Sequence, residues 1–367
     1  MFFLAFSCEK KIEIDKKTVF RYNETKNLNS LDPIFAKDLS NIKVINQLFN
    51  GLVDMNSKLE VIPSIAKSWN ISSDGKVYTF LLRNDVFFNP HPDLNERNVK
   101  AKDFEYSFKR LIDPNNASPG KWVFDKVDNF KAVNDTVFKI TLNQPFNPFL
   151  GILTMEYCSV VPKEVVESKS TEFRSSPIGT GPFKFKRWEE NIKLVLRKND
   201  KYFEKDQKGV QLPYLEAVSI TFFPEKQSEF LQLIKDEIDM ISGIDNSFKD
   251  EILEINGDIK NKYKESIKIL KGPFLNTEYL AFFMNSIKKE VQSPLIRKAI
   301  NIGFDKNKMI KFLRNGIGKP ANGGIIPIGL KGYKLNEYNL YDPEKAKEYI
   351  DQYKKITNEI PSLKLTT

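Results

Sequence analysis

The spacing of apolar residues alternates between two patterns along the chain, and each pattern predicts one kind of element. Alternation, together with β-branched and aromatic residues, predicts strands at 17–22, 77–82, 183–188, 192–197, 217–223 and 278–284. Asn134-Asp135 is typical of a hairpin turn, which would join 130–133 to 136–142. A repeat every three to four residues predicts helices from about 40 to 50 and from about 227 to 235.

Polar residues and prolines mark where helices begin and end. Ser40 is the expected N-cap of the first helix, and Gly51 follows its last turn. Another helix carries its apolar residues on one face and stops before an Asp-Pro pair, as the restriction on residues before proline predicts: Phe104, Phe108, Leu111 and Asp113-Pro114. Helices are also expected to start at Ser293, Asp305 and Asp342.

The arrangement of these elements predicts an α/β protein with more than one domain. A β-rich stretch, 59–171, lies between stretches of mixed α/β character. The sequence contains no internal repeat, and no low-complexity linker separates these stretches, so we expect interleaved domains. No apolar run reaches the roughly 20 residues that a membrane-spanning helix needs.

The composition is that of a globular protein with a large core, since 41% of the 367 residues are hydrophobic and 12% are aromatic. The net charge of +9 invites a nucleic-acid interpretation. However, no three basic residues are consecutive and acidic residues are interspersed throughout, which is typical of a solvated surface. We therefore expect no nucleic-acid partner.

Residue types that carry catalytic and metal chemistry are scarce. The single histidine, His91, lies between prolines in a loop and is expected to be exposed. The glycine turn at 178–183 leads into a strand, whereas a phosphate-binding loop needs Gly-Lys-Ser/Thr and a helix. No Gly-x-Ser-x-Gly motif and no distinctive pair of acids occurs. We predict no catalytic residue, no metal site and no cofactor.

Aromatic residues are the remaining candidates for a binding surface. Trp122, Phe124 and Tyr157 lie in loop-like segments, where an aromatic side chain either lines a cleft or packs in the core. The sequence around each one leaves both alternatives open.

The N-terminal residues carry a targeting signal. Residues 1–8 are a short apolar stretch that ends in Ser7-Cys8 and precedes a polar segment. This resembles the end of a bacterial lipoprotein signal, in which Cys8 is lipidated after cleavage; an ordinary tail is the alternative. If Cys8 is acylated, Cys158 has no disulfide partner, and the apolar run at 152–161 predicts a buried, inert thiol.

A series of motifs follows one order from about residue 18 to the end: Leu31-Asp32-Pro33, 48–52, 65–69, 78–83, 100–114, Asn116-Ala117-Ser118-Pro119, 179–183, 236–239, 293–306, 318–321 and 341–346. In this order they resemble the oligopeptide- and dipeptide-binding proteins of ABC importers, extracellular solute-binding protein family 5. Lys100 departs from the capping Thr of many relatives, which costs about 1 kcal/mol unless another group caps that helix.

The resemblance implies a two-lobed α/β fold, the type II periplasmic-binding-protein fold, with an extra β-rich subdomain. The implied division is a signal remnant at 1–8, lobe I at 9–58 and 172–265, the subdomain at 59–171 and a hinge-linked lobe II at 266–367. In relatives, the segment matching 37–39 pairs with the ligand backbone as a strand, and the loop matching 118–124 borders the side-chain pockets. The implied ligand-binding residues are Lys37, Asp38, Leu39, Trp122 and Phe124.

The resemblance also implies a function. The protein would capture di- and oligopeptides between its lobes and deliver them to the permease and ATPase subunits of an importer, without catalysing a reaction. We expect a periplasmic monomer, anchored to the membrane through lipidated Cys8. Nickel, haem or a sugar are alternative ligands within the family, and a hydrolase is the alternative from another class.

The family continues beyond the position of Thr367, and the acid that meets the peptide amino group in relatives belongs to that later part. We therefore expect a C-terminally truncated second lobe. In the 367-residue chain made alone, we expect about the last hundred residues to be unstable and peptide binding to be weak.

Overall fold

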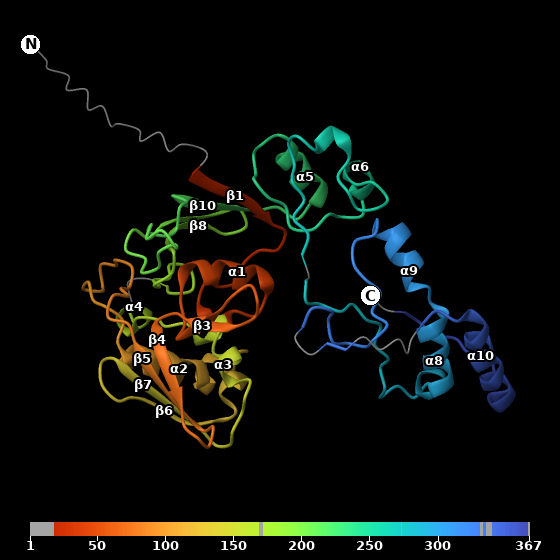
Figure 1. Cartoon of the computed structure of the whole chain (residues 1–367), viewed down its shortest axis with the longest axis horizontal. Helices are drawn as coiled ribbons and strands as arrows, with labels where there is room; N and C mark the ends of the chain where they lie inside the picture. The colour runs from red at the N-terminus through yellow and green to blue at the C-terminus, as the bar shows by residue number, and fades with distance from the viewer. Residues whose placement is uncertain (1–17, 169–171, 273, 331–332, 335–339, 366–367) are drawn as a thin grey trace, which may run out of the picture. The chain divides into compact units, whose positions relative to one another are not determined.

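The computed structural model describes residues 18–168, 172–272, 274–330, 333–334 and 340–365. Cys8, the predicted lipidation site, lies outside these residues. The chain forms two compact units, which meet in the sequence between Ser242 and Gly243, and each unit is described by itself (Figure 1). The finer division into two lobes and a subdomain stays a prediction.

The first unit contains a mixed four-stranded sheet. Its strand order is β1-β10-β9-β8, with bounds Val19–Glu24, Ala217–Phe222, Lys193–Lys198 and Phe183–Glu189. β1 is parallel to β10, with Val19 opposite Ala217, whereas β9 is antiparallel to both of its neighbours. Because β1 and β10 are far apart in the sequence, the chain leaves this sheet after β1 and returns to it at β8.

Between β1 and β8 the chain forms an antiparallel sheet that packs against a helix (Figure 1). Its strand order is β4-β5-β7-β6, with bounds Ala66–Ile71, Val77–Leu82, Val137–Leu142 and Val127–Ala132. Helix α2 (Ala101–Ile112) packs on β6 and β7. The buried apolar side chains of β5 and α2 point into one core. Among the described residues, the fully buried aromatic side chains of this core are Phe80, Phe104, Phe108, Phe138 and Phe149.

Shorter elements complete the first unit. They are β2 (Val53–Met55), β3 (Val61–Pro63), helices α1 (Leu39–Leu48), α3 (Phe149–Ile152), α4 (Lys163–Val166) and α5 (Lys226–Ile234), and 3-10 turns η2 (Pro33–Phe35), η3 (Pro114–Asn116), η4 (Lys121–Phe124) and η5 (Glu156–Cys158). The predicted glycine turn lies against the C-terminal end of α1. The Gly181 N–H donates to the Leu48 carbonyl at 2.9 Å, and a Cβ at Gly181 would come 2.5 Å from the Leu48 carbonyl carbon. This approach requires glycine.

The described residues of the second unit form helices without a strand. The elements are α6 (Lys249–Ile252), η6 (Asn261–Tyr263), α7 (Lys289–Gln292), α8 (Pro294–Gly303), α9 (Lys306–Lys308), the π-helical turn η7 (Met309–Leu313) and α10 (Pro343–Thr357). α8 and α10 pack side by side. As predicted, Asp305 and Asp342 cap α9 and α10 with their side chains.

Two helix starts differ from the sequence expectation. The prediction that Ser40 caps α1 is wrong, because Asp38 holds the N-cap position and the Ser40 hydroxyl donates to Glu24 at 2.8 Å. The missing cap at Lys100 is partly replaced from within the helix. The Asp103 carboxylate accepts the Lys100 N–H at 2.8 Å, which satisfies one of the unpaired amides at this end.

Two other expectations are wrong. His91 is not exposed: 8% of its side chain is accessible, and its Nδ1 accepts the Asp93 N–H at 3.1 Å. The described residues 278–284 form no strand, and most of their large apolar side chains are exposed: Tyr279, Leu280, Phe283 and Met284. The prediction for Cys158 is confirmed, since this residue is 1% exposed and burial raises the pKa of its thiol.

Candidate ligand-binding site

Lys37, Asp38 and Leu39 form an exposed stretch, in which Lys37 and Asp38 follow the turn η2 and Leu39 is the first residue of helix α1. Asp38 has an extended backbone, with φ −98° and ψ 148°. Within the described part of the chain, the Asp38 N–H and the Lys37 carbonyl have no hydrogen-bond partner. These two groups belong to one trans peptide unit and point to opposite sides, so an added strand on either side can pair with one of them.

The loop after α2 reaches back to this stretch. Pro114 ends α2, the Asp113 carboxylate accepts the Asn115 N–H at 2.9 Å, and Ala117 takes a left-handed conformation with φ 48°. The chain then turns, and the Ser118 hydroxyl donates to the Ile34 carbonyl in η2 at 2.6 Å. This hydrogen bond joins the loop to the turn that precedes the exposed stretch.

Tyr157 connects the same two segments. A Cβ at Gly120 would lie 2.3 Å from Tyr157 Cδ1, so the ring packs directly on the loop backbone. The side chain is buried. Burial raises the pKa of the Tyr157 hydroxyl, and the negative charges of Asp38 and Glu156 add to this effect. The turn η5, which carries Tyr157, also packs against the turn η2 that precedes the exposed stretch.

The two aromatic residues predicted in the loop have opposite environments. Trp122 is 48% exposed. Phe124 is 6% exposed, and its ring centroid lies 4.7 Å from that of Phe108 and 5.5 Å from that of Phe130. Trp122 therefore offers an open aromatic face, whereas Phe124 anchors the turn η4 in the core. Ligand contact by either residue stays a prediction.

The electrostatics of this region are set by partly buried acids. Burial raises the pKa of Glu156, and the charge of Asp54 acts in the same direction. The exposed Asp38 carboxylate lies close enough to Tyr157 to affect its ionisation. The site thus combines unpaired backbone groups, an open indole and acidic neighbours, which suits binding of a polar, amine-bearing chain molecule.

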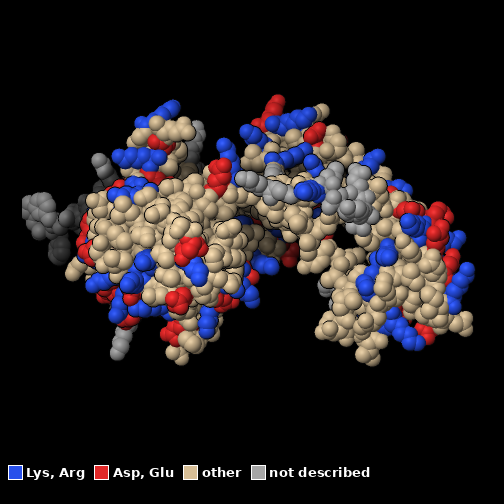
Figure 2. Space-filling model, turned by 60° about the horizontal axis from the view of Figure 1, so that its bottom comes forward, with Lys and Arg blue, Asp and Glu red and all other residues tan. Residues whose placement is uncertain are grey.

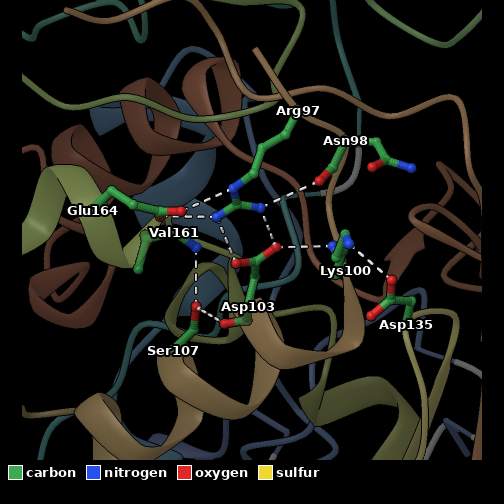
Figure 3. A network of polar contacts seen from close by, with 8 residues as sticks. All are labelled: Arg97, Asn98, Lys100, Asp103, Ser107, Asp135, Val161 and Glu164. Carbon is green, nitrogen blue, oxygen red and sulfur yellow. Dashed lines mark hydrogen bonds and ion pairs between the residues drawn. The ribbon is translucent and has the colours of Figure 1, made fainter. Parts of the chain in front are cut away.

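A second polar cluster, at the start of α2, pairs its charges internally (Figure 3). Arg97 donates to Asp103 at 2.8 and 2.9 Å and to Glu164 at 2.9 and 2.8 Å. Burial alone would lower the pKa of Arg97, but these hydrogen bonds outweigh burial and raise it. Ser107 extends the cluster, because its hydroxyl donates to the Asp103 carbonyl and accepts the Val161 N–H. We interpret the cluster as a structural clamp between α2 and α4.

Other kinds of site find little support. The described residues contain no group of three or more His, Cys, Asp and Glu side chains that would hold a metal ion. Among the described helices, none has the length and apolar character needed to cross a membrane. On the face drawn in Figure 2, basic and acidic side chains are interspersed, as the sequence suggested.

The signals for part of this site were absent from the sequence. Gly120 follows Pro119, which marks a turn but gives no hint that the Tyr157 ring packs on it. The hydrogen bond between Ser118 and Ile34 joins residues 84 positions apart, and local rules do not reach that far.

Solved periplasmic binding proteins share this architecture. The ABC transporter-associated periplasmic binding protein DppA from Helicobacter pylori, in complex with the peptide STSA, is 28% identical with a TM-score of 0.76, over 91% of this chain and 66% of that one. The dipeptide binding protein from Pseudoalteromonas sp. SM9913, in complex with Met-Leu, is 22% identical with a TM-score of 0.76 over the same shares. The protein therefore has the type II periplasmic-binding-protein fold, which confirms the predicted fold class.

The profile of the bacterial extracellular solute-binding proteins, family 5 Middle, matches residues 60–361, and the chain belongs to this family. Among curated proteins, the oligopeptide-binding protein OppA of Bacillus subtilis (strain 168) is 28% identical over 98% of this chain. The dipeptide-binding protein of Escherichia coli (strain K12) is 28% identical over 83% of it. The matches cover 67% and 57% of those two proteins.

Proposed function

We propose that this protein is the peptide-binding component of an ABC importer. It captures di- and oligopeptides and delivers them to the permease and ATPase subunits. The observation that carries this proposal is the exposed stretch at Lys37 to Leu39, in which Asp38 is extended and the peptide unit between Lys37 and Asp38 lacks partners in the described chain. The names of the relatives, which bind oligopeptides and dipeptides, support it.

The binding mechanism follows from backbone chemistry. A peptide enclosed by hinge closure leaves water, and each buried backbone group without a partner costs about 1–3 kcal/mol. The unpaired peptide unit between Lys37 and Asp38 supplies one such partner to a ligand strand, either the Asp38 N–H or the Lys37 carbonyl. Because strand pairing is independent of side chains, one site accepts many sequences. The exposed Trp122 adds apolar contact with the ligand side chains, and Lys37 and Leu39 belong to the proposed set. Phe124 contributes by holding the loop of Trp122 in place from the core.

The proposal extends to location and catalysis. The protein is exported, lipidated on Cys8, held at the membrane in the periplasm and monomeric, and it turns nothing over. Labelling with a radioactive fatty acid tests the anchor. The wild-type protein should be labelled and Cys8→Ser should not, and equal labelling of both would contradict lipidation at this residue.

Native mass spectrometry of the whole protein tests the ligand class. The protein is incubated separately with a mixed di- to pentapeptide library, free amino acids, nickel, haem and a sugar mixture. We expect stoichiometric retention of uncleaved peptides alone. Retention of nickel, haem or a sugar instead of peptides would contradict the proposal, and catalytic loss of peptide would make the protein a hydrolase.

A pair of variants locates the site. Trp122→Ala should weaken peptide binding by about tenfold, the equivalent of 1.4 kcal/mol. Tyr214→Ala removes another exposed aromatic of the same unit, 63% accessible, and should leave affinity unchanged. Equal affinities of Trp122→Ala and the wild type would remove Trp122 from the site.

A further inference from the structure

A buried ion pair between Arg110 and Asp32 joins helix α2 to the segment that precedes the exposed stretch. Arg110 on α2 donates to both carboxylate oxygens of Asp32, with the Nη1–Oδ1 distance at 2.8 Å. The side chains are 14% and 4% exposed. Arg110 also lies 5.8 Å from the centroid of the Phe173 ring. A bidentate, desolvated pair of this kind fixes the relative position of the two backbones that carry it.

Asp32 fixes the conformation of the turn that precedes the exposed stretch. Its Oδ1 accepts the Ile34 N–H at 3.3 Å and so caps the turn η2. Two residues before Asp32, the Ser30 hydroxyl accepts the Asp32 N–H, and the Ser30 carbonyl accepts the side-chain amide of Asn41 in α1. The chain from Ser30 to Asn41 is therefore tied at both ends, with the exposed stretch between the ties.

Arg110 holds the loop after α2 through a backbone hydrogen bond. Its backbone carbonyl accepts the Asn116 side-chain amide at 2.8 Å. Two residues later, the Ser118 hydroxyl donates to the Ile34 carbonyl. The contacts close a ring that runs from Asp32 to Arg110, through Asn116 and Ser118, and back to Ile34. The exposed stretch and the loop that carries Trp122 both begin at residues of this ring.

We propose that Asp32 and Arg110 are positioning residues, which set the distance between the exposed stretch and the loop that carries Trp122. This inference rests on the proposed function. Neither side chain touches the ligand. Removal of Arg110 leaves a buried carboxylate without its partner, so Asp32 must move or hydrate, and both segments lose their common anchor.

The test compares Arg110→Met with Arg97→Met in the whole protein. Both arginines make bidentate ion pairs with a buried aspartate, and Arg97 belongs to the clamp of Figure 3, outside the ring. We measure hydrogen exchange without ligand and affinity for a library peptide. Arg110→Met should accelerate exchange together in 34–37 and 116–124 and weaken affinity by at least about tenfold. Arg97→Met should change neither.

Arg110→Lys keeps the positive charge but loses the bidentate geometry of the guanidinium, so it should give an intermediate affinity. It replaces Arg110→Met in the test if Arg110→Met does not fold. The inference is overturned if exchange accelerates in only one segment, or if Arg97→Met weakens affinity equally. Wild-type protein that retains no peptide would refute the proposed function alone, because exchange reports the coupling of the two segments without any ligand.

Discussion

Gly120→Ala offers a direct test of how the loop packs on Tyr157. The backbone of Gly120 has φ −87° and ψ 0°, which alanine adopts without strain, so the effect is purely steric. The new Cβ would lie 2.3, 2.4 and 2.8 Å from three atoms of the Tyr157 ring. Ordinary contact begins near 3.4 Å, so the ring or the loop must move by about 1 Å. The ring is buried and has little room to move.

Overpacking of this kind costs about 1–3 kcal/mol, which corresponds to a fall of about 2–12 °C in the unfolding midpoint of a unit this size. Displacement of the loop should also weaken peptide binding. Gly151→Ala is the matched control, because its Cβ would meet only Met55 Cε at 3.9 Å and it lies in helix α3. Calorimetry should show it as stable as wild type or slightly more stable. If Gly120→Ala unfolds at the wild-type temperature, the packing described here is wrong.

Three further predictions concern the first unit. Gly181→Ala places a Cβ against the backbone of Leu48, which cannot rotate away, so chemical denaturation should show a loss of about 3 kcal/mol or more; a loss below that of Gly120→Ala would contradict this. Because burial raises the pKa of the Cys158 thiol, a thiol reagent at pH 8 should label it only after unfolding. Burial also raises the pKa of Glu156, so its ionisation opposes folding as the pH rises through that pKa. Glu156→Gln should therefore be more stable than wild type at pH 7 and equal to it at pH 4, as measured by urea unfolding; the reverse order would refute the assignment.

The sequence predicted helices and strands best where a segment with a regular apolar pattern packs against another element close to it in the chain. The alternation at 77–82 and the helical spacing at 101–112 are both satisfied within one core. The stretch 278–284 carries a similar alternation, but no described strand pairs with it. A strand is stabilised by its neighbour, so pattern alone does not establish it.

Single residues failed where a distant group decided their role. Ser40 is a good N-cap by local rules, yet its hydroxyl is engaged by Glu24. His91 lies in a loop that composition marks as exposed, yet folding buries it. For the site, the motif series indicated the exposed stretch and the Trp122 loop. The contacts that join them, through Tyr157 and Arg110, depend on tertiary structure and had no sequence signal.

The central claim is that the ligand is held through its backbone by the stretch at Lys37 to Leu39. A scan of one tight-binding peptide, methylated at one amide nitrogen at a time, tests this with isothermal titration calorimetry on the whole protein. Each methyl group removes one N–H donor and keeps the side chains. The account predicts that methylation at one or two positions weakens binding by tenfold or more, since a lost buried hydrogen bond costs about 1–3 kcal/mol, while alanine replacement at the same positions has a smaller effect. If every methylated peptide binds as tightly as the parent, backbone pairing does not hold the ligand.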